Sequence, residues 1–145
     1  MTAEIINRTR SRFETGQAIR GVRRVLEALK RSGLRQSKTG YRISIVLVGR
    51  DEGRVLNKRF LGKNRPANVL SFDYGAYGEI ILTLPALKEE ARARQVDFYD
   101  WFLRMVVHGA LHLAGRHHES SQVFAKRFAK LEKKLLARLG LSFTK

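Results

Sequence analysis

Three histidines have the residue type and the spacing that a bound metal ion requires. They lie in the segment HGALHLAGRHH, residues 108–118, with the pattern H-x3-H-x2-G-x2-H. Four residues advance an α-helix by about 400°, so His108 and His112 share one helix face, one turn apart. Gly115 has no Cβ and can end the helix, which lets the chain turn back and bring His118 toward the same point. Three converging imidazoles predict a site for one metal ion, and zinc fits such ligands.

A different interpretation is that the first two histidines only occupy a polar helix face. Their neighbours argue against it, because nearly all of them are apolar and predict a buried helix: Met105, Val106, Val107, Ala110, Leu111, Leu113 and Ala114. Buried neutral imidazoles need polar partners, so we expect His108 and His112 to be buried against a metal ion. Three protein ligands leave a fourth position open to water, as in catalytic zinc sites.

The chain carries far more positive than negative charge. Its 29 lysines and arginines stand against 13 aspartates and glutamates, a formal net charge of +16 over 145 residues. Such an excess opposes a compact fold by self-repulsion, so it favours a polyanionic partner, of which nucleic acid is the commonest. Solubility alone and an acidic membrane are the alternatives. The chain has no cysteine, which excludes disulfide partners and leaves nitrogen and oxygen ligands for the metal.

The histidine spacing also matches the zinc peptidase pattern H-E-x-x-H-x-x-G-x-x-H, with one exception. Gly109 stands where those peptidases have the glutamate that deprotonates water. Glycine has no group that can do so, which argues against peptide hydrolysis. Three neutral ligands leave the metal its full charge, so it should acidify water and stabilise charge on a phosphate oxygen. With the basic composition, this predicts that a zinc-activated water attacks a phosphodiester.

The elements that position these residues follow from hydrophobic periodicity, turn residues and caps. Apolar patterns predict strands at 4–6, 40–49, 68–72 and 79–83, the last two joined by a turn at 73–78 and antiparallel. Helical spacing predicts helices at 11–32, 51–60, 85–94, 98–114 and from 120 or 121 to 139, with Asp51 and Asp97 as N-caps and Pro85 as the first helical residue. We therefore predict one α+β domain, residues 1–145, with about five helices around a small mixed sheet of about four strands.

With these residues in place, the sequence resembles a known family. The segment His-Gly-x-Leu-His-Leu-x-Gly-x-x-His at 108–118 is similar to the pattern HGxLHLxGYDH of YbeY-type proteins. These are bacterial and organellar rRNA maturation factors, regarded as zinc-dependent, single-strand-specific endoribonucleases. Upstream, Asn57, Gly62, Lys63 and the run NVLSF at 68–72 resemble the family segment N-x-x-[YF]-R-G-K-D-x-x-T-[DN]-V-L-S-F. The motifs GEI at 78–80 and EA at 90–91 extend the likeness in the same order.

The resemblance implies a function as well as metal ligands. His108, His112 and His118 would bind one zinc ion and act in catalysis through the water bound to it. The substrate would be single-stranded rRNA at the 3′ end of the 16S species of the small ribosomal subunit, with a role in ribosome quality control. We expect a cytoplasmic location and no membrane partner, because residues 1–10 contain no apolar leader and no apolar run is long enough to span a bilayer.

Two positions depart from the family pattern. Leu61 stands where the family has the arginine to which phosphate contact is attributed, before Gly-Lys. Arg59 and Arg65 are close enough in sequence to take its place. His117 stands where the family has an aspartate, and it could donate a hydrogen bond beside the metal ligands, bind RNA or face solvent. Both departures bear on the catalytic rate more than on metal binding.

Four residues are candidates for RNA binding: Arg59, Lys63 and Arg65, near a Gly/Pro loop, and Asn68 at the start of a strand. A solvated loop and a simple turn residue are the alternatives. Glu119 follows His118 and could act as a general base or accept a hydrogen bond beside the metal ligands. It could equally cap the last helix together with the serines that follow it.

Two other functions are compatible with the same residues. A non-catalytic ribosome assembly factor would use zinc to hold its fold and its basic surface to bind rRNA, and Leu61 motivates this alternative. A zinc peptidase is disfavoured by Gly109. The six lysines and arginines at 126–138 are expected on the solvated face of the last helix, where they could also meet rRNA.

Overall fold

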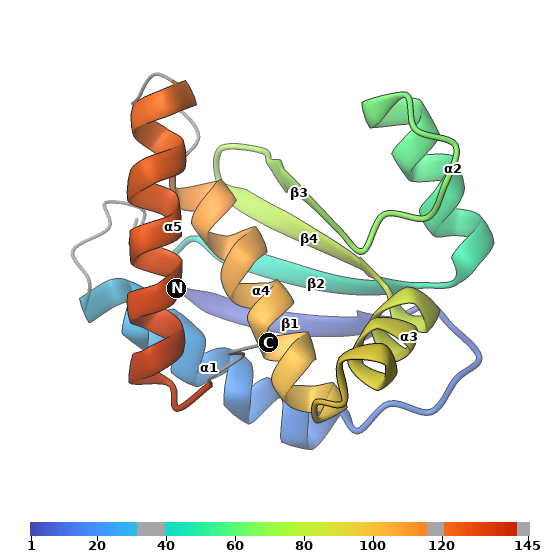
Figure 1. Cartoon of the computed structure of the whole chain (residues 1–145), viewed down its shortest axis with the longest axis horizontal. Helices are drawn as coiled ribbons and strands as arrows, with labels where there is room; N and C mark the ends of the chain where they lie inside the picture. Colours follow the sequence, from blue (N-terminus) through green and yellow to red (C-terminus); the bar gives the residue numbers. More distant parts are fainter. Residues whose placement is uncertain (32–39, 116–120, 142–145) are drawn as a thin grey trace.

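A four-stranded mixed sheet lies at the centre of the computed structural model, which describes residues 1–31, 40–115 and 121–141 (Figure 1). The strand order is β1-β2-β4-β3, with bounds β1 (Thr2–Asn7), β2 (Arg42–Val48), β4 (Tyr77–Thr83) and β3 (Val69–Asp73). The first three of these strands are parallel, and β3 is antiparallel to β4 across a turn at Gly75. The α+β class, the mixed sheet and its antiparallel pair are thus confirmed.

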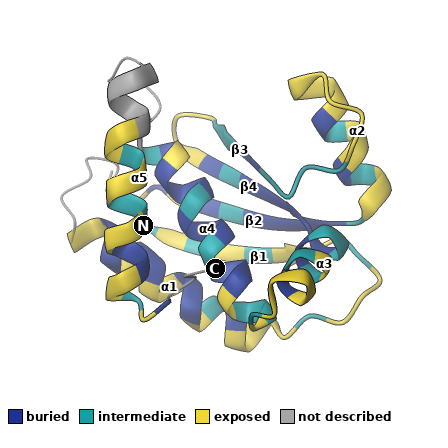
Figure 2. Cartoon of the chain, in the orientation of Figure 1, coloured by how far each residue is buried: buried dark blue, intermediate teal, exposed yellow. Residues whose placement is uncertain are grey.

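The two faces of the sheet are covered unequally. On one side lie α1 (Thr15–Arg31), α3 (Leu84–Arg94), α4 (Phe98–Gly115) and α5 (Ser121–Arg138), which share the main core with sheet residues such as Ile45 and Ile80. On the other side α2 (Arg50–Leu61) contributes Leu56 to a small cluster with Val46 and Val48. Figure 2 shows the same contrast, with mostly buried residues along α4 and mostly exposed residues along α2.

Helix α4 is buried along most of its length and begins where the sequence predicts. The backbone N–H of Asp100 donates to Oδ2 of Asp97 at 3.1 Å, which confirms the predicted N-cap. The buried side chains come from several sides of the helix and include Trp101, Phe102, Val106 and Leu113. Although α4 is apolar, no helix among the described residues is both long and apolar enough to cross a membrane.

Helix α2 begins at Arg50, ahead of its predicted cap Asp51, and α3 begins one residue earlier than predicted. Gly49 occupies the N-cap position, because it is the single residue between β2 and α2. It has no side chain, so this helix start has no side-chain cap. Asp51 is exposed in the first turn, 3.6 Å from Arg54. In the same way α3 follows β4 directly, so Thr83 occupies its N-cap position and Pro85 is the second helical residue.

Helix α1 begins later than predicted, because the side chain of Asn7 holds the preceding loop. Its Nδ2 donates to the carbonyl oxygen of Ser11 and its Oδ1 accepts from the N–H of Thr9, both at 2.9 Å. Such local bonds compete with helix formation, and the helix starts at Thr15. Its predicted end at Ser32 lies outside the described residues.

Candidate functional site

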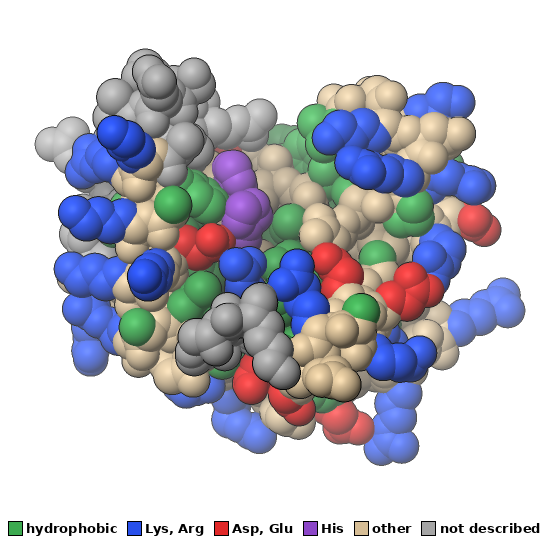
Figure 3. Space-filling view, in the orientation of Figure 1, with side chains coloured by type: hydrophobic (Ala, Val, Ile, Leu, Met, Phe, Trp, Pro, Cys, Tyr) green, Lys and Arg blue, Asp and Glu red, His purple; other side chains and the backbone are tan. Residues whose placement is uncertain are grey.

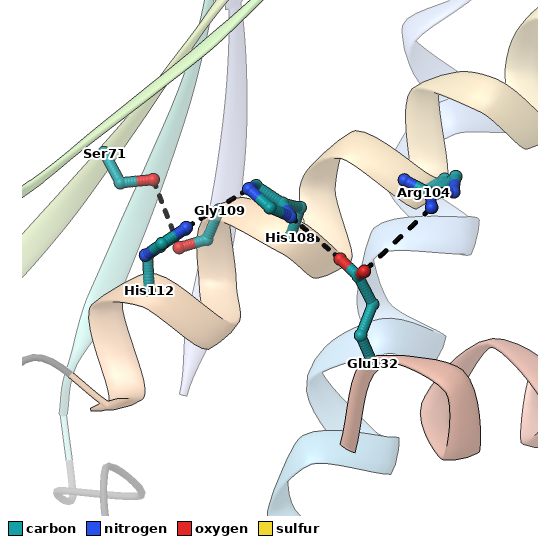
Figure 4. Close-up of polar contacts among 6 residues, drawn as sticks. All are labelled: Ser71, Arg104, His108, Gly109, His112 and Glu132. Atoms are coloured by element: carbon teal, nitrogen blue, oxygen red, sulfur yellow. Dashed lines mark hydrogen bonds and ion pairs between the residues drawn. The ribbon is translucent and has the colours of Figure 1, made fainter. Parts of the chain in front are cut away.

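His108 and His112 project side by side from one face of α4 (Figure 4). Their Nε2 atoms are 3.1 Å apart and their ring centroids 4.7 Å apart. Two nitrogens that bind one zinc ion tetrahedrally at about 2.0–2.1 Å lie roughly 3.3 Å from each other. The spacing of the two imidazoles therefore fits a shared metal ion.

The two histidines are less buried than the sequence indicated. The His108 side chain is 32% exposed and His112 is an exposed residue, so the expectation that both are buried is wrong. The apolar neighbours bury the other faces of α4, while the stripe with the histidines remains at the surface. Figure 3 shows the histidines in a hollow between the α5 side and the α2 side of the molecule. The site is therefore accessible to a large substrate.

Glu132 of α5 fixes the orientation of His108. The Nδ1 of His108 lies 2.8 Å from Oε2 of Glu132, whose side chain is only 14% exposed. Arg104 approaches the other carboxylate oxygen at 4.0 Å. When Nδ1 carries the proton and donates a hydrogen bond to the carboxylate, Nε2 keeps its lone pair free for a metal ion.

Burial and charge act in opposite directions on Glu132. Burial raises the pKa of its carboxyl group, but the hydrogen bond with His108 and the charges of His108, Arg104 and His112 outweigh it, so the pKa lies below its usual value. The carboxylate is thus ready to accept the bond from Nδ1. Glu132 was not predicted as a site residue, although it is the one acidic residue of α5.

Phe128, one turn before Glu132 on α5, packs against both imidazoles. Its ring centroid lies 5.0 Å from that of His108, edge to face, and 4.6 Å from that of His112. Helix α5 thus contributes one carboxylate and one aromatic ring to the histidine pair. Together these contacts restrict the rotamers of both imidazoles, as a preorganised metal site would require.

Gly109 allows α4 to lie close to the sheet. A Cβ at this position would lie 2.9 Å from Cγ2 of Ile80 and 3.0 Å from Oγ of Ser71. The Ser71 hydroxyl donates to the carbonyl oxygen of Gly109 at 3.2 Å (Figure 4). The position at which zinc peptidases have a glutamate therefore faces packed side chains here, which strengthens the argument against peptide hydrolysis.

The third predicted ligand, His118, lies outside the described residues, as do His117 and Glu119. Within the ranges 1–31, 40–115 and 121–141, no group of three or more His, Cys, Asp or Glu side chains could hold a metal ion. The described part of the chain thus provides two of the three predicted ligands, and the third stays a prediction.

Three of the four predicted RNA-binding residues line one pocket. Lys63, Arg65 and Asn68 surround a cavity of about 340 Å³ between α2, α3 and the start of β3, together with Leu61 and Glu90. Asn68 also donates from Nδ2 to Oε2 of Glu90 at 3.3 Å. The fourth residue, Arg59, is not among the residues that line the pocket; its guanidinium lies over the ring of Phe60, 5.5 Å from the centroid.

Asn57 holds the loop that carries these cations. It is 3% exposed, and its Nδ2 donates to the carbonyl oxygen of Arg65 at 2.7 Å. Gly62 ends α2 with a φ of 71°, a left-handed conformation that favours glycine. Asn57 entered the sequence analysis only through the family resemblance, and its role in fixing the loop was not predicted.

Strand β3 connects the pocket with the histidine helix. Val69 lines the pocket, and Ser71 is bonded to Gly109 of α4. Residues two apart in a strand lie on the same face, about 7 Å from each other. Strand β3 therefore lies between the pocket and α4, with Val69 at the pocket and Ser71 against Gly109.

Comparison with known proteins agrees with the sequence resemblance. A sequence model of the family described as "Endoribonuclease YbeY" matches residues 4–140. The chain is 39% identical to "Endoribonuclease YbeY" of Bordetella avium over 106 residues, 69% of this chain and 65% of that protein. It is also 39% identical to the protein of the same name from Nitrosomonas eutropha over 102 residues, 68% of this chain and 72% of that protein. The first match spans slightly less than two thirds of that relative's length.

A solved structure has a similar fold. The solution structure of TM1509 from Thermotoga maritima superposes with a TM-score of 0.59 and 26% sequence identity. The superposition covers 94% of this chain and 90% of that one, so the arrangement of strands and helices is shared over nearly the whole length of both.

Proposed function

This chain belongs to the YbeY family, and on that premise we propose that it is a zinc-dependent endoribonuclease that cuts single-stranded rRNA. The observation that best supports a metal-dependent reaction is the pair of Nε2 atoms of His108 and His112, 3.1 Å apart. The carboxylate of Glu132, 2.8 Å from the far nitrogen of His108, supports the same reading.

We assign the metal ligands to His108, His112 and, as a prediction from the motif, His118. Neutral imidazoles suit zinc, and a zinc ion bound by them would supply a Lewis acid that activates water and stabilises charge on a phosphate oxygen. The protein side chains have separate tasks. Glu132 keeps the proton of His108 on Nδ1, and Phe128 limits the rotation of both rings.

The RNA backbone would lie along β3, between the histidines and the pocket at the end of α2. Lys63 and Arg65 are exposed at this pocket and can contact phosphates, while Asn68 can donate or accept hydrogen bonds. The proposed substrate is the 3′ end of 16S rRNA on the small ribosomal subunit, and the proposed location is the cytoplasm. We treat residues 1–145 as a single catalytic domain.

A non-catalytic assembly factor is the second candidate. Leu61, 57% exposed, contributes an apolar side chain to the pocket where the family pattern has an arginine. A chain without that cation could bind rRNA and zinc and still cleave slowly or not at all. Arg65 lines the same pocket and is the residue best placed to compensate.

Cleavage of defined RNAs distinguishes the two candidates. We would compare metal-free and zinc-loaded protein on a single strand with the 16S 3′ sequence and on the same sequence as a duplex. The zinc-loaded protein should cut the single strand. His112→Ala should reduce the rate at least about 100-fold, since the ion is worth several kcal/mol in the transition state. Asn64→Ala is the matched control, because Asn64 is an exposed residue like His112.

Two outcomes separate the candidates, and a folding control accompanies them. If the zinc-loaded protein leaves the single strand intact and behaves like His112→Ala, the nuclease proposal is wrong. Tight RNA binding without cleavage in that experiment would support the assembly factor. An unchanged unfolding midpoint of His112→Ala would show that lost cleavage is not caused by lost folding, as expected for an exposed side chain.

A further inference from the structure

Helix α5 presents a strongly basic face away from the histidines. Its lysines and arginines are all exposed: Lys126, Arg127, Lys130, Lys133, Lys134 and Arg138. At 100° per residue they fall within about 140° of the helix circumference and span roughly 18 Å. Six positive charges and one negative charge give the helix a net charge of +5. The one acidic residue, Glu132, contacts His108 and lies outside the basic face. Figure 3 shows Lys and Arg side chains along the α5 side of the hollow.

Four of these charges repel one another and lack acidic partners among the described residues. Lys126, Lys130, Lys134 and Arg138 are four residues apart in turn, and like charges at this spacing destabilise a helix. In the part of the chain that the structure describes, none of these four forms an ion pair with an acidic side chain. Elsewhere, by contrast, Arg8, Arg31 and Arg50 each pair with a glutamate. A polyanion would neutralise the face and release the counterions condensed on it.

We propose that this face of α5 is a second RNA contact, which binds backbone phosphates of the substrate beyond the hollow that holds the histidines. The choice of RNA rests on the proposed function. Because Glu132 and Phe128 on the inner side of α5 contact the histidines, an RNA bound on the outer side lies one helix diameter, about 10–12 Å, from the cleavage site. A strand that leaves the hollow can therefore reach the face within a few nucleotides.

The apolar residues of the molecule favour RNA over a protein or a membrane. Protein interfaces depend on buried apolar anchors. The exposed large hydrophobic side chains all lie outside residues 126–138, the part of α5 whose side chains are described: Ile6, Val55, Phe60, Leu61, Tyr74 and Tyr77. An interfacial membrane helix needs a free apolar face. Over residues 126–138 the apolar side of α5 is already used, since Leu135 and Leu136 are buried in the core.

Salt-dependent binding of two RNAs to the full chain tests the proposal. One RNA of about 6 nucleotides fills the hollow alone, and one of about 30 nucleotides extends beyond it. The variant is Lys130→Gln with Lys133→Gln and Lys134→Gln, since glutamine has a helix propensity close to that of lysine. The matched control removes three exposed cations from other elements, by Arg23→Gln, Arg42→Gln and Arg92→Gln.

The two RNAs should respond differently. For the long RNA, the slope of log affinity against log salt should fall by about 2 in the α5 variant, because each single-strand phosphate contact contributes about 0.7. The control variant should keep most of the wild-type slope. Affinity for the short RNA and its cleavage should be unchanged in both variants.

Equal slopes for the α5 variant and the control on the long RNA would overturn the proposal, while cleavage of the short RNA by the wild type would leave the nuclease function standing. A wild-type protein that neither binds nor cuts either RNA would overturn both. Binding to phosphatidylserine vesicles that is lost in the α5 variant, with RNA binding unchanged, would assign the face to membranes and contradict the RNA contact.

Discussion

Helices α4 and α2 both carry predicted functional residues, but the protein holds them very differently. Helix α4 is packed into the main core and approaches the sheet so closely at Gly109 that a Cβ would meet Ile80. Helix α2 buries only Gly53 and Asn57, and it exposes Val55, Phe60 and Leu61 by more than half. The metal-binding candidates therefore sit on the rigid helix, and the phosphate-binding candidates follow the loosely held one.

The difference matches the demands of the two tasks. Metal ligands must be held within about 0.5 Å of their working positions, which a helix fixed by core packing can provide. Contacts to a phosphate backbone tolerate adjustment, because they depend mainly on charge. We therefore expect substitutions around α4 to change stability and metal binding together, and substitutions around α2 to affect mainly RNA binding.

The largest effect is expected for His108→Ala. The substitution removes a proposed metal ligand, which should lower cleavage at least about 100-fold. It also leaves the carboxylate of Glu132, 14% exposed, without its hydrogen-bond donor. That loss should reduce the free energy of unfolding by about 1–3 kcal/mol. Cleavage assays and urea denaturation of the same preparation measure both effects.

His112→Ala is the matched control, because His112 is an exposed residue and the 2.8 Å contact with Glu132 is made by His108. It should lower cleavage equally with little loss of stability. Equal destabilisation by the two variants would contradict the view that His108 is the anchored member of the pair.

Gly109→Val should be the most damaging substitution for stability alone. Its side chain would enter the space occupied by Ile80 and Ser71, and such overpacking costs about 3 kcal/mol. Gly16→Val is a useful comparison, because Gly16 also lies in a helix but has no atom within 4 Å of its missing Cβ. Unfolding midpoints that fall equally in both variants would show that the close approach of α4 to the sheet is not important.

Glu132→Gln should weaken metal binding without removing a ligand. Partners that orient a metal-bound histidine typically contribute 10–100-fold to metal affinity, so we expect a loss of about that size. Competition with a zinc chelator measures it, and Glu89→Gln on the exposed surface is the control. An unchanged zinc affinity would mean that Glu132 supports the fold but not the metal.

Asn57→Ala tests the weaker attachment of the α2 region. It removes the bond to the carbonyl oxygen of Arg65 and should cost about 1–2 kcal/mol of stability. RNA affinity should fall a few-fold while zinc affinity stays constant, because the loop with Lys63 and Arg65 loses its anchor. Asn64→Ala in the same loop is the control, since Asn64 is exposed. A fall in zinc affinity would contradict the separation of the two regions.

The sequence predicts α4 well because its signals are strong and local. The apolar pattern, the cap at Asp97 and the paired histidines all depend on residues within a few turns. The family resemblance and the α+β class are confirmed. The exposure of His112 was wrongly predicted, because the apolar neighbours show that the helix is buried but not which stripe of it stays open.

Contacts between distant elements could not be predicted from local patterns. Glu132 meets His108 across 24 residues, and the contact depends on how α5 packs on α4. The bond from Asn57 to the Arg65 carbonyl depends on the path of the intervening loop. The predicted cap at Asp51 was wrong because the position of β2 sets the start of α2. Only Gly49 separates the two elements, so the helix begins at Arg50. His117, His118 and Glu119 remain predictions from the motif.

The central claim is that one metal ion on the α4 histidines is required for RNA cleavage. The most direct test is the cleavage rate of a single-stranded RNA during titration of the metal-free protein with zinc. We predict a rate that rises in proportion to added zinc and levels off at one equivalent per chain. A rate that is already maximal without metal, or that never responds to it, would contradict the claim.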